Sequence, residues 1–209
     1  MQVLLYIAAA ACGYFVGGIN PAIAMSKAIY HQDIRECGRG NPGFTNFRRT
    51  FGNRWAWWVL ALDLTKAAVV VRCFAWLFGT YLGDRQLGAA YTGVFAMLGH
   101  AYPMMYGFKG GKGFLVCLST MWVIDWRTGL FATVFMVVLL LITKYMSLST
   151  MLAIWSCPVT LAVCKASAAV IVLCVAMALL MTFRHKENIK RLCKRTERRF
   201  TLKGTSNSG

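Results

Sequence analysis

A glycine-rich stretch of the chain carries residues that could bind an anion. Residues 38–49 read GRGNPGFTNFRR, and closely spaced glycines let successive backbone N–H groups converge on one point. Asparagine and threonine side chains add donors, and arginine can hold phosphate oxygens through two parallel bonds. We predict an anion site here, although a charged turn between two helices would have a similar composition. The candidate binding residues are Arg39, Gly40, Asn41, Gly43, Thr45, Asn46 and Arg49.

A second stretch, residues 108–113, reads FKGGKG and stands immediately before an apolar run. A phosphate there would meet free N–H groups at a helix N-terminus together with two ammonium groups. The alternative is a short charged hinge. A nucleotide-binding P-loop needs Ser or Thr where this chain has Gly113, so an ATPase is disfavoured. The candidate residues are Lys109, Gly110, Gly111 and Lys112.

Two further polar groups complete the set of candidates. Residues 184–192 read RHKENIKRL, and a continuing helix would place His185 and Asn188 on one face. A basic helix on the membrane surface explains that stretch about as well. Ser147 belongs to a small polar cluster over residues 144–149. We select His185, Lys112 and Ser147 as candidate catalytic residues and Asn188 as a binding residue.

The elements that must position these residues are apolar helices. Of 209 residues, 58% are hydrophobic and 14% charged, which excludes a disordered chain and disfavours a soluble domain. Runs near the 20 residues that span a bilayer predict an all-α polytopic membrane protein with seven spans, some of them short. Asp63 and Lys66 lie one turn apart in the second run and are expected to pair for structural reasons. The runs cover residues 3–29, 55–78, 88–106, 114–124, 129–143, 148–163 and 166–183.

The net charge of +16 would suggest a nucleic acid partner in a soluble protein. Here, however, most basic residues lie in the segments between and after the apolar runs. With the N-terminus outside, 17 basic residues fall on one side of the membrane and 3 on the other. This bias predicts that the basic side and the C-terminus are cytoplasmic. Residues 1–192 form a single membrane-embedded domain, and residues 193–209 are expected to be a basic, disordered cytoplasmic tail. All the candidate stretches then share one membrane face and one cationic pocket.

The motifs resemble those of the PlsY family of acyl-phosphate-dependent glycerol-3-phosphate acyltransferases. Residues 38–52 are similar to the family pattern GSGNxGATNxxRxxG, and residues 99–113 are similar to GHxxPxFxxFKGGKG. Residues 184–192 match RHxxNIxRL, and residues 62–66 match LDxxK. The segment 144–148 resembles the family's RYxSL. The resemblance covers residues 17–192 with the motifs in the family's order.

This resemblance implies a seven-helix enzyme in the bacterial inner (cytoplasmic) membrane, with its active site facing the cytoplasm. The implied reaction transfers a fatty acyl group from acyl phosphate to the 1-hydroxyl of sn-glycerol 3-phosphate, giving lysophosphatidic acid and phosphate. The expected partners are these two substrates and membrane lipids, without a cofactor or metal. The departures from the family include Arg39 in place of a serine, Phe44 in place of an alanine and Lys144 in place of an arginine. The change at Arg39 leaves open whether the activity is preserved.

The sequence also bears on the mechanism. Acyltransferases of the HxxxxD type use histidine as a base, but neither His100 nor His185 has an acidic residue five positions later; only His31 does, at Glu36. Acyl phosphate already has a good leaving group, so positioning and charge stabilisation could supply most of the acceleration. Either His185 or the leaving phosphate would take the hydroxyl proton.

We assign the two phosphates to different groups of residues. Glycerol phosphate is assigned to Arg49, Lys112, His185 and Asn188. The donor phosphate is assigned to the backbone of residues 40–43 with Thr45 and Asn46, and Ser147 helps to hold a substrate. An anion transporter is the rival hypothesis, but the motifs cluster on one side of the membrane whereas a transporter places broken helices near its middle.

Overall fold

The computed structural model describes residues 1–201. This part of the chain is all-helical and contains no strand, as the sequence predicted. The α-helices are α1 (Gln2–Gly18), α2 (Pro21–Tyr30), α3 (Phe44–Phe51), α4 (Asn53–Leu82), α5 (Arg85–Ala101), α6 (Phe114–Ile124), α7 (Trp126–Thr143), α8 (Met146–Val163), α9 (Ala168–Arg184) and α10 (Lys186–Cys193), with a 3-10 helix, η1 (Met104–Tyr106).

All seven predicted apolar runs are helical, but the first is two helices rather than one kinked span. α1 ends at Gly18, and α2 begins at Pro21. Proline suits the first position of a helix because its missing N–H would have no partner there. The Asn20 side chain accepts a hydrogen bond from the Ile23 N–H at 3.0 Å, which caps the new helix.

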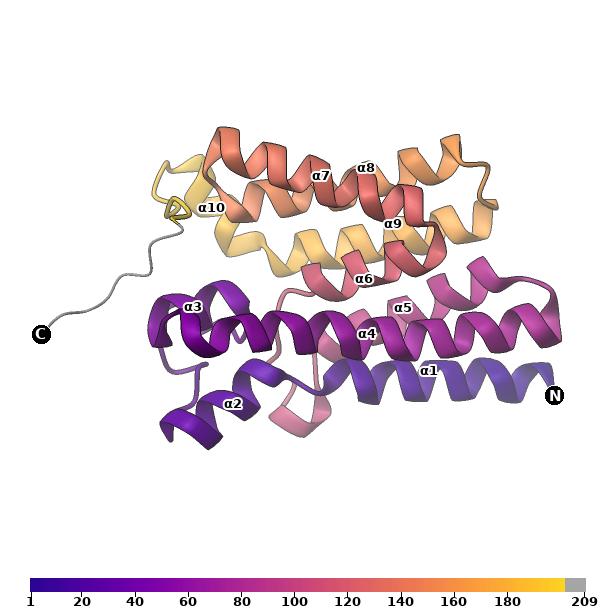
Figure 1. Ribbon diagram of the computed structural model, residues 1–209, viewed down its shortest axis with the longest axis horizontal. Coiled ribbons are helices and arrows are strands. Elements are labelled where there is room, and N and C mark those ends of the chain that lie inside the picture. The colour runs from indigo at the N-terminus through magenta and orange to yellow at the C-terminus, as the bar shows by residue number, and fades with distance from the viewer. Residues whose placement is uncertain (202–209) are drawn as a thin grey trace, which may run out of the picture.

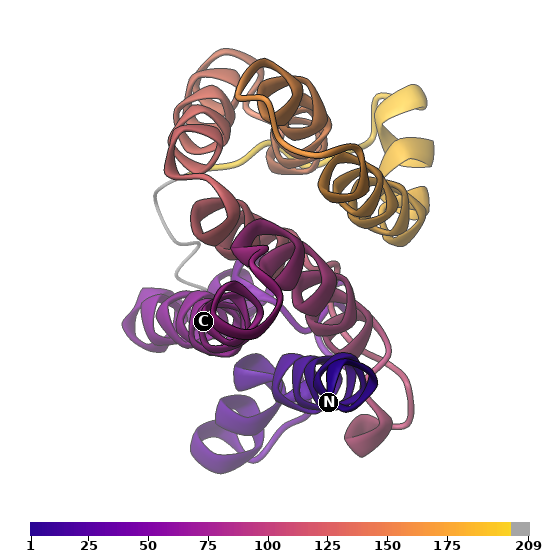
Figure 2. The ribbon, with the colours of Figure 1, turned by 90° about the vertical axis from the view of Figure 1, so that its right-hand side faces the viewer.

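The helices form two groups with α6 between them. α1, α4 and α5 pack on one another, and α7, α8 and α9 form the second group. α6 contacts members of both groups, and α5 also packs against α9. Figures 1 and 2 show this arrangement from the side and along the helices. The N-terminus lies at the opposite end of the bundle from α3 and α10 (Figure 1).

α6 is too short to cross a bilayer alone. Its 11 residues extend about 16 Å at about 1.5 Å per residue, roughly half of an apolar core of about 30 Å. Most of its side chains are buried, as expected for a helix that is apolar on every side. Asp125 follows it directly and caps α7 by accepting from the Arg127 N–H at 2.8 Å. α6 is therefore an internal half-length helix.

The length and composition of the helices support a membrane protein without fixing the span count. The segments 2–30, 126–143 and 146–163 are long and apolar enough to cross a membrane, as are α9 and α10 if that bent pair is one span. α4 has 30 residues but carries Asp63, Lys66 and Arg72. The seven-span count and the orientation of the termini stay predictions.

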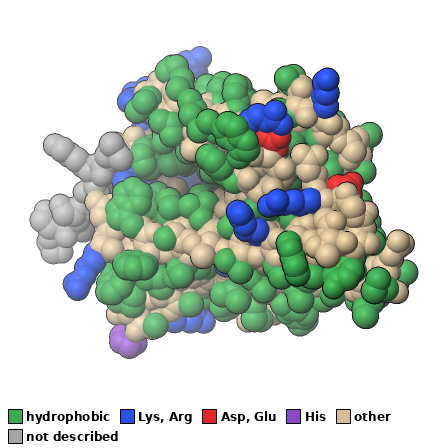
Figure 3. All heavy atoms as spheres, turned by 45° about the vertical axis from the view of Figure 1, so that its right-hand side comes forward, with side chains coloured by type: hydrophobic (Ala, Val, Ile, Leu, Met, Phe, Trp, Pro, Cys, Tyr) green, Lys and Arg blue, Asp and Glu red, His purple; other side chains and the backbone are tan. Residues whose placement is uncertain are grey.

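The outside of the bundle is apolar. Large hydrophobic side chains are exposed along most helices, and Figure 3 shows them covering much of one face. A soluble monomer rarely exposes such large contiguous apolar patches, whereas a lipid environment accommodates them without cost. Examples are Trp57, Trp58, Trp76, Leu141, Ile142, Val159 and Val172.

A small separate core fixes the glycine-rich stretch at one end of the bundle. It contains Ile23 from α2, Ile34 from the following loop, Phe47 from α3 and Val59 from α4. Residues 44–51, which the sequence suggested were loop, form α3, and α3 packs against α4. This packing holds the N-terminus of α3 in a defined place beside the bundle.

Candidate active site

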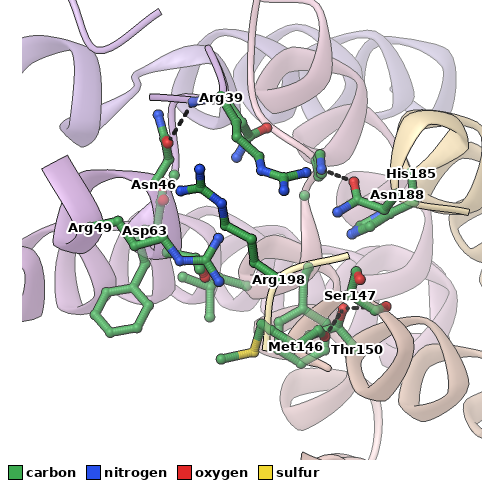
Figure 4. A pocket seen from close by; sticks show the side chains of 18 of the residues that line it. Arg39, Asn46, Arg49, Asp63, Met146, Ser147, Thr150, His185, Asn188 and Arg198 are labelled. Carbon is green, nitrogen blue, oxygen red and sulfur yellow. Dashed lines mark hydrogen bonds between the residues drawn. The ribbon is translucent and has the colours of Figure 1, made fainter. Parts of the chain in front are cut away.

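A cavity of about 200 Å³ lies where all the candidate stretches meet. It combines residues from α3, α4, α8, the start of α6, the junction of α9 and α10, and the C-terminal segment (Figure 4). The predicted residues that line it are Arg39, Asn41, Gly43, Thr45, Asn46, Arg49, Lys112, Ser147, His185 and Asn188. Gly40, Lys109, Gly110 and Gly111 do not line it.

The glycine-rich stretch presents a helix N-terminus to the cavity. Gly43 precedes the first helical residue of α3, and no side chain caps that end. The first N–H groups of a helix lack internal partners and favour anions. Gly40 instead has φ of +69° in a turn, and its N–H is bonded to the Cys37 carbonyl at 3.0 Å. Gly40 therefore shapes the loop. The N–H groups that could bind an anion belong to the N-terminus of α3, which follows Gly43.

Asn46 supports this loop from within. Its amide oxygen accepts from the Arg39 N–H at 3.0 Å, and its amide nitrogen donates to the Cys37 carbonyl at 3.0 Å. These bonds engage both ends of the amide, so the side chain mainly fixes the path of residues 37–39. Asn46 also lines the cavity, and its predicted role in binding phosphate stays a prediction.

The glycine pair Gly110 and Gly111 has a packing role. A Cβ at Gly111 would lie 2.2 Å from Nε2 of His100, and one at Gly110 would lie 2.1 Å from the His100 carbonyl oxygen. Arg184, to which the sequence analysis assigned no role, donates to the carbonyls of Gly110 at 2.9 Å and Gly111 at 3.2 Å. Because Lys109 is exposed, only Lys112 of this stretch brings a cation to the cavity.

Lys112 and Asn188 are directly joined. The ammonium group of Lys112 donates to the amide oxygen of Asn188. Burial, followed by repulsion from Arg191, lowers the pKa of Lys112 to about 8. The group is therefore mainly charged at neutral pH and close to its titration point. Asn188 in turn donates to Glu197 Oε1 at 2.6 Å, so the amide bridges the lysine and a carboxylate.

Glu197 is one of the cavity residues that the sequence analysis missed. Its carboxylate accepts from Ser147 Oγ at 3.0 Å, from Arg191 Nε at 2.6 Å and from Arg39 Nη1 at 3.3 Å. Burial alone would raise its pKa, but the bonds from Arg191, Asn188 and Ser147 outweigh burial and hold the pKa below its usual range. Glu197 and Glu187 are the two acidic residues among the many basic ones from residue 184 onward. Only the fold distinguishes them.

The C-terminal segment covers the cavity. Its Phe200 N–H donates to the Lys144 carbonyl at 2.6 Å, and the Arg48 guanidinium lies 4.5 Å from the centre of the Phe200 ring. Arg198 lines the cavity together with Arg49, and both side chains extend into the same opening (Figure 4). These contacts join the first part of the predicted tail to the rest of the chain, and a disordered tail from residue 193 stays a prediction. Residues 202–209 of the predicted tail lie outside the described residues.

His185 sits at a break that the sequence analysis did not predict. α9 and α10 meet there at a bend of 62°, so the last helix does not continue straight. His185 and Asn188 nevertheless both line the cavity. His185 Nδ1 lies 2.9 Å from the Met181 carbonyl oxygen. A carbonyl can only accept, so Nδ1 carries the proton and Nε2 of the neutral ring is left as an acceptor.

A buried cluster from α4 and α5 forms another part of the wall. Lys66 Nζ lies 2.8 Å from Asp63 Oδ1, which supports the predicted pair, and 3.2 Å from His100 Nδ1. Lys66 also donates to the Ile19 carbonyl at the break between α1 and α2. Asp63 and His100 line the cavity. The predicted pair is therefore present, and its Asp63 lines the cavity beside His100.

The cavity has a cationic part and an apolar part. Five basic residues that line it, Arg39, Arg49, Lys112, Arg191 and Arg198, outnumber two carboxylates, Asp63 and Glu197. Burial, then repulsion from Arg39 and Arg198, lowers the pKa of Arg49. The apolar part consists of Phe44, Leu60, Phe114, Leu115, Met136 and Met146. Within residues 1–201, no three His, Cys, Asp or Glu side chains gather as metal ligands would.

The fold and cavity are those of an integral membrane protein with a cationic cavity at one end of a helical bundle. Residues 7–195 match the family model described as glycerol-3-phosphate acyltransferase. The chain belongs to this family, which includes PlsY, so the resemblance seen in the motifs is confirmed.

Relatives and solved structures match along nearly the whole chain. The glycerol-3-phosphate acyltransferase of Rhizobium etli (strain CIAT 652) is 36% identical over 199 residues, covering 95% of this chain and 93% of the relative. That of Thermotoga petrophila is 34% identical over 190 residues, covering 91% and 94%. A crystal structure of PlsY, an integral membrane glycerol 3-phosphate acyltransferase, in its glycerol 3-phosphate form has a TM-score of 0.84 at 30% identity and covers 95% of both chains. Its lysophosphatidic acid form has a TM-score of 0.83 at 28% identity, covering 94% and 95%.

Proposed function

We propose that this protein transfers a fatty acyl group from acyl phosphate to the 1-hydroxyl of sn-glycerol 3-phosphate. The observation that carries the proposal is that one cavity joins a cationic part to an apolar part. The cations suit two phosphorylated reactants, and the apolar side chains suit the start of an acyl chain. The cavity is too small to enclose a long chain, so the rest of the chain extends outward into the lipid.

The residues divide between the two reactants. Arg49, Lys112, His185 and Asn188 hold glycerol phosphate, and the N-terminus of α3 with Thr45 holds the donor phosphate. Ser147 helps to hold a substrate. Glu197 positions the Ser147 side chain by accepting a hydrogen bond of 3.0 Å from its hydroxyl group. Holding both reactants in one small space converts an encounter in solution into a reaction between neighbours.

In the chemical step, the 1-oxygen of glycerol phosphate forms a bond to the acyl carbon. The bond from that carbon to the phosphate oxygen breaks, and inorganic phosphate leaves. The hydroxyl proton passes either to the leaving phosphate or to His185 Nε2, which the bond from Nδ1 to Met181 leaves as an acceptor. The cations around the cavity stabilise the negative charge that develops on the phosphate.

Replacing His185 with Gln separates these two proton acceptors. A base role requires the limiting rate to fall, because no other ring nitrogen replaces Nε2. A role confined to binding raises the KM for glycerol phosphate and leaves the limiting rate intact. Steady-state rates at saturating palmitoyl phosphate measure both quantities, and an unchanged limiting rate would exclude His185 as the base.

We further propose that α1 with α2, and α4 to α9, correspond to the seven predicted spans of a bacterial inner membrane protein. The N-terminus would then lie outside and the cavity at the cytoplasmic face. The excess of basic residues in the segments at the cavity end supports this orientation. Labelling of single cysteines introduced near residues 39 and 109 tests it, and labelling of these positions from opposite sides would exclude a shared site.

The donor is tested directly with the purified protein. Glycerol 3-phosphate is supplied with palmitoyl phosphate or with palmitoyl-CoA, without added metal, and lysophosphatidate and phosphate are measured. We expect product from palmitoyl phosphate only. Product from palmitoyl-CoA alone would exclude the proposed donor, and no product from either would exclude acyl transfer to glycerol phosphate.

A further inference from the structure

One outward-facing stripe of α4 carries an arginine within an apolar run. Val69, Arg72, Cys73, Trp76 and Thr80 follow the spacing that places side chains on one face of a helix. All five are exposed, with Trp76 at 63% of its full area. The buried residues of α4 lie on the opposite face. The stripe therefore faces away from the bundle and toward lipid.

Arg85, the first residue of α5, joins this stripe. The two arginines and Trp76 line an open groove of about 690 Å³. Gly79 lets α4 and the first residue of α5 come close together, since a Cβ at Gly79 would lie only 3.3 Å from the Arg85 Cβ. The groove lies at the α4–α5 turn, at the other end of α4 from α3 and the cationic cavity (Figure 1).

The nearby acidic residues do not neutralise these arginines. Asp84 caps α5 by accepting from the Leu87 N–H at 2.8 Å, and Asp125 pairs with Arg127 at 2.7 Å. Within the described residues 1–201, neither Arg72 nor Arg85 forms an ion pair or a side-chain hydrogen bond. An arginine within a membrane helix normally faces the bundle and is paired, because an isolated charge in lipid is costly. This exception points to an anion from outside the protein.

We propose that Arg72 and Arg85 bind the phosphate of an anionic phospholipid at the end of the bundle opposite the active site. Two guanidinium groups can hold one phosphate through several charged hydrogen bonds. Arg72 reaches the interface by extending its side chain along the helix, and Trp76 suits the boundary between head groups and chains. An acyl chain would run along Val69 and Leu62, which continue the stripe toward α3. The proposal assumes membrane embedding and is independent of acyl transfer.

A second copy of this chain is a poor fit for the groove. A chain with a net charge of +16 would bring more positive charge to two unpaired arginines. The two aspartates at this end already cap helices. Charge complementarity therefore favours a lipid over a copy.

The test uses the full chain in phosphatidylcholine vesicles that contain a photoactivatable phosphatidylglycerol, with adducts mapped by mass spectrometry. We expect adducts within residues 69–80. The Arg72→Gln/Arg85→Gln variant should show about tenfold fewer, because hydrogen bonds to charged groups are lost. Arg127→Gln is the matched control, since it removes a paired arginine at the same end and should leave the adducts unchanged.

Three outcomes would overturn the proposal. Equal adducts in the double variant would show that the arginines do not hold the lipid. Equal labelling by a photoactivatable phosphatidylcholine would show that the groove does not select anionic head groups. Disulfide cross-linking through Cys73 that joins two copies despite excess phosphatidylglycerol would make a second copy the occupant. Unchanged thermal unfolding and acyl transfer in the double variant show that it is folded.

Discussion

Two charged clusters line the same cavity and differ in how their charges are balanced. Asp63, Lys66 and His100 come from α4 and α5, and their charged or polar atoms lie 2.8–3.6 Å from one another. Around Glu197, by contrast, five cations from separate segments share the cavity with this carboxylate. In the first cluster one carboxylate is matched by one ammonium group, so this cluster adds no excess positive charge to the cavity. The second cluster has more positive than negative side chains and is therefore the one suited to phosphate. An excess of positive charge is thus a better guide to the site than the presence of charged residues.

The largest expected effect separates the binding cluster from nearby surface charge. Lys112→Ala should lower acyl transfer by about 10²–10³, because its ammonium group is the cation that the segment before α6 brings to the cavity. Lys109→Ala should retain nearly full activity, since Lys109 is exposed and outside the cavity. Turnover rates of both purified variants measure the difference. Wild-type turnover by Lys112→Ala would remove that residue from the site.

Substitutions in the cluster of Asp63, Lys66 and His100 should mainly change the stability of the protein. Asp63→Asn leaves Lys66 buried without its carboxylate and should cost about 3 kcal/mol, or roughly 6–12 °C in melting temperature. Adding Lys66→Met should recover much of that loss, because an apolar side chain needs no partner. Thermal unfolding in detergent measures both variants. A double variant no more stable than the single one would contradict a balanced pair.

Glu197 tests whether one carboxylate organises the binding cluster. Glu197→Gln leaves the charges of Arg39 and Arg191 uncompensated and should lower stability by about 1–3 kcal/mol, given the partial exposure of both arginines. Glu187→Gln is the matched control, since the Glu187–Lys190 pair is exposed and should shift the melting temperature little. Equal melting temperatures for the two variants would mean that residues 194–201 do not support the site.

A change of pH should have a smaller effect, on the KM for glycerol phosphate. Lys112 has a pKa of about 8, so its charge is present below pH 8 and is lost as the pH rises through this value. The KM for glycerol phosphate should therefore be nearly constant between about pH 6.5 and 7.5 and should rise up to about tenfold per pH unit above 8. Lys112→Arg should move this rise to higher pH. A KM that stays flat to pH 9.5 would show that Lys112 does not bind the phosphate as a cation.

The smallest effect concerns the departure from the family at Arg39. Arg39→Ser restores the family residue and removes a partly exposed ion pair with Glu197 of 3.3 Å. Such pairs contribute about 0.2–1 kcal/mol, so kcat/KM should change less than about fivefold. Steady-state kinetics with palmitoyl phosphate measures this change. A change of a hundredfold in either direction would mean that Arg39 contacts a reactant directly.

The sequence by itself determined the helical class, the apolar runs and the family. Apolar runs determine helices because nearly every residue of the run must satisfy its backbone within the same segment. Most of the candidate residues chosen from the motifs line the cavity, including Lys112, Ser147, His185 and Asn188. These features depend on local composition and on the order of short patterns, which are visible without the fold.

Only the tertiary structure decided which member of each motif reaches the cavity. Lys109 and Lys112 are equivalent in the sequence, but the packing of the glycine pair against His100 turns only Lys112 inward. Glu197 and Glu187 likewise differ only because the C-terminal segment folds back over Ser147 and Arg39. These choices depend on contacts between residues as far as 158 positions apart, and local periodicity carries no information about such contacts.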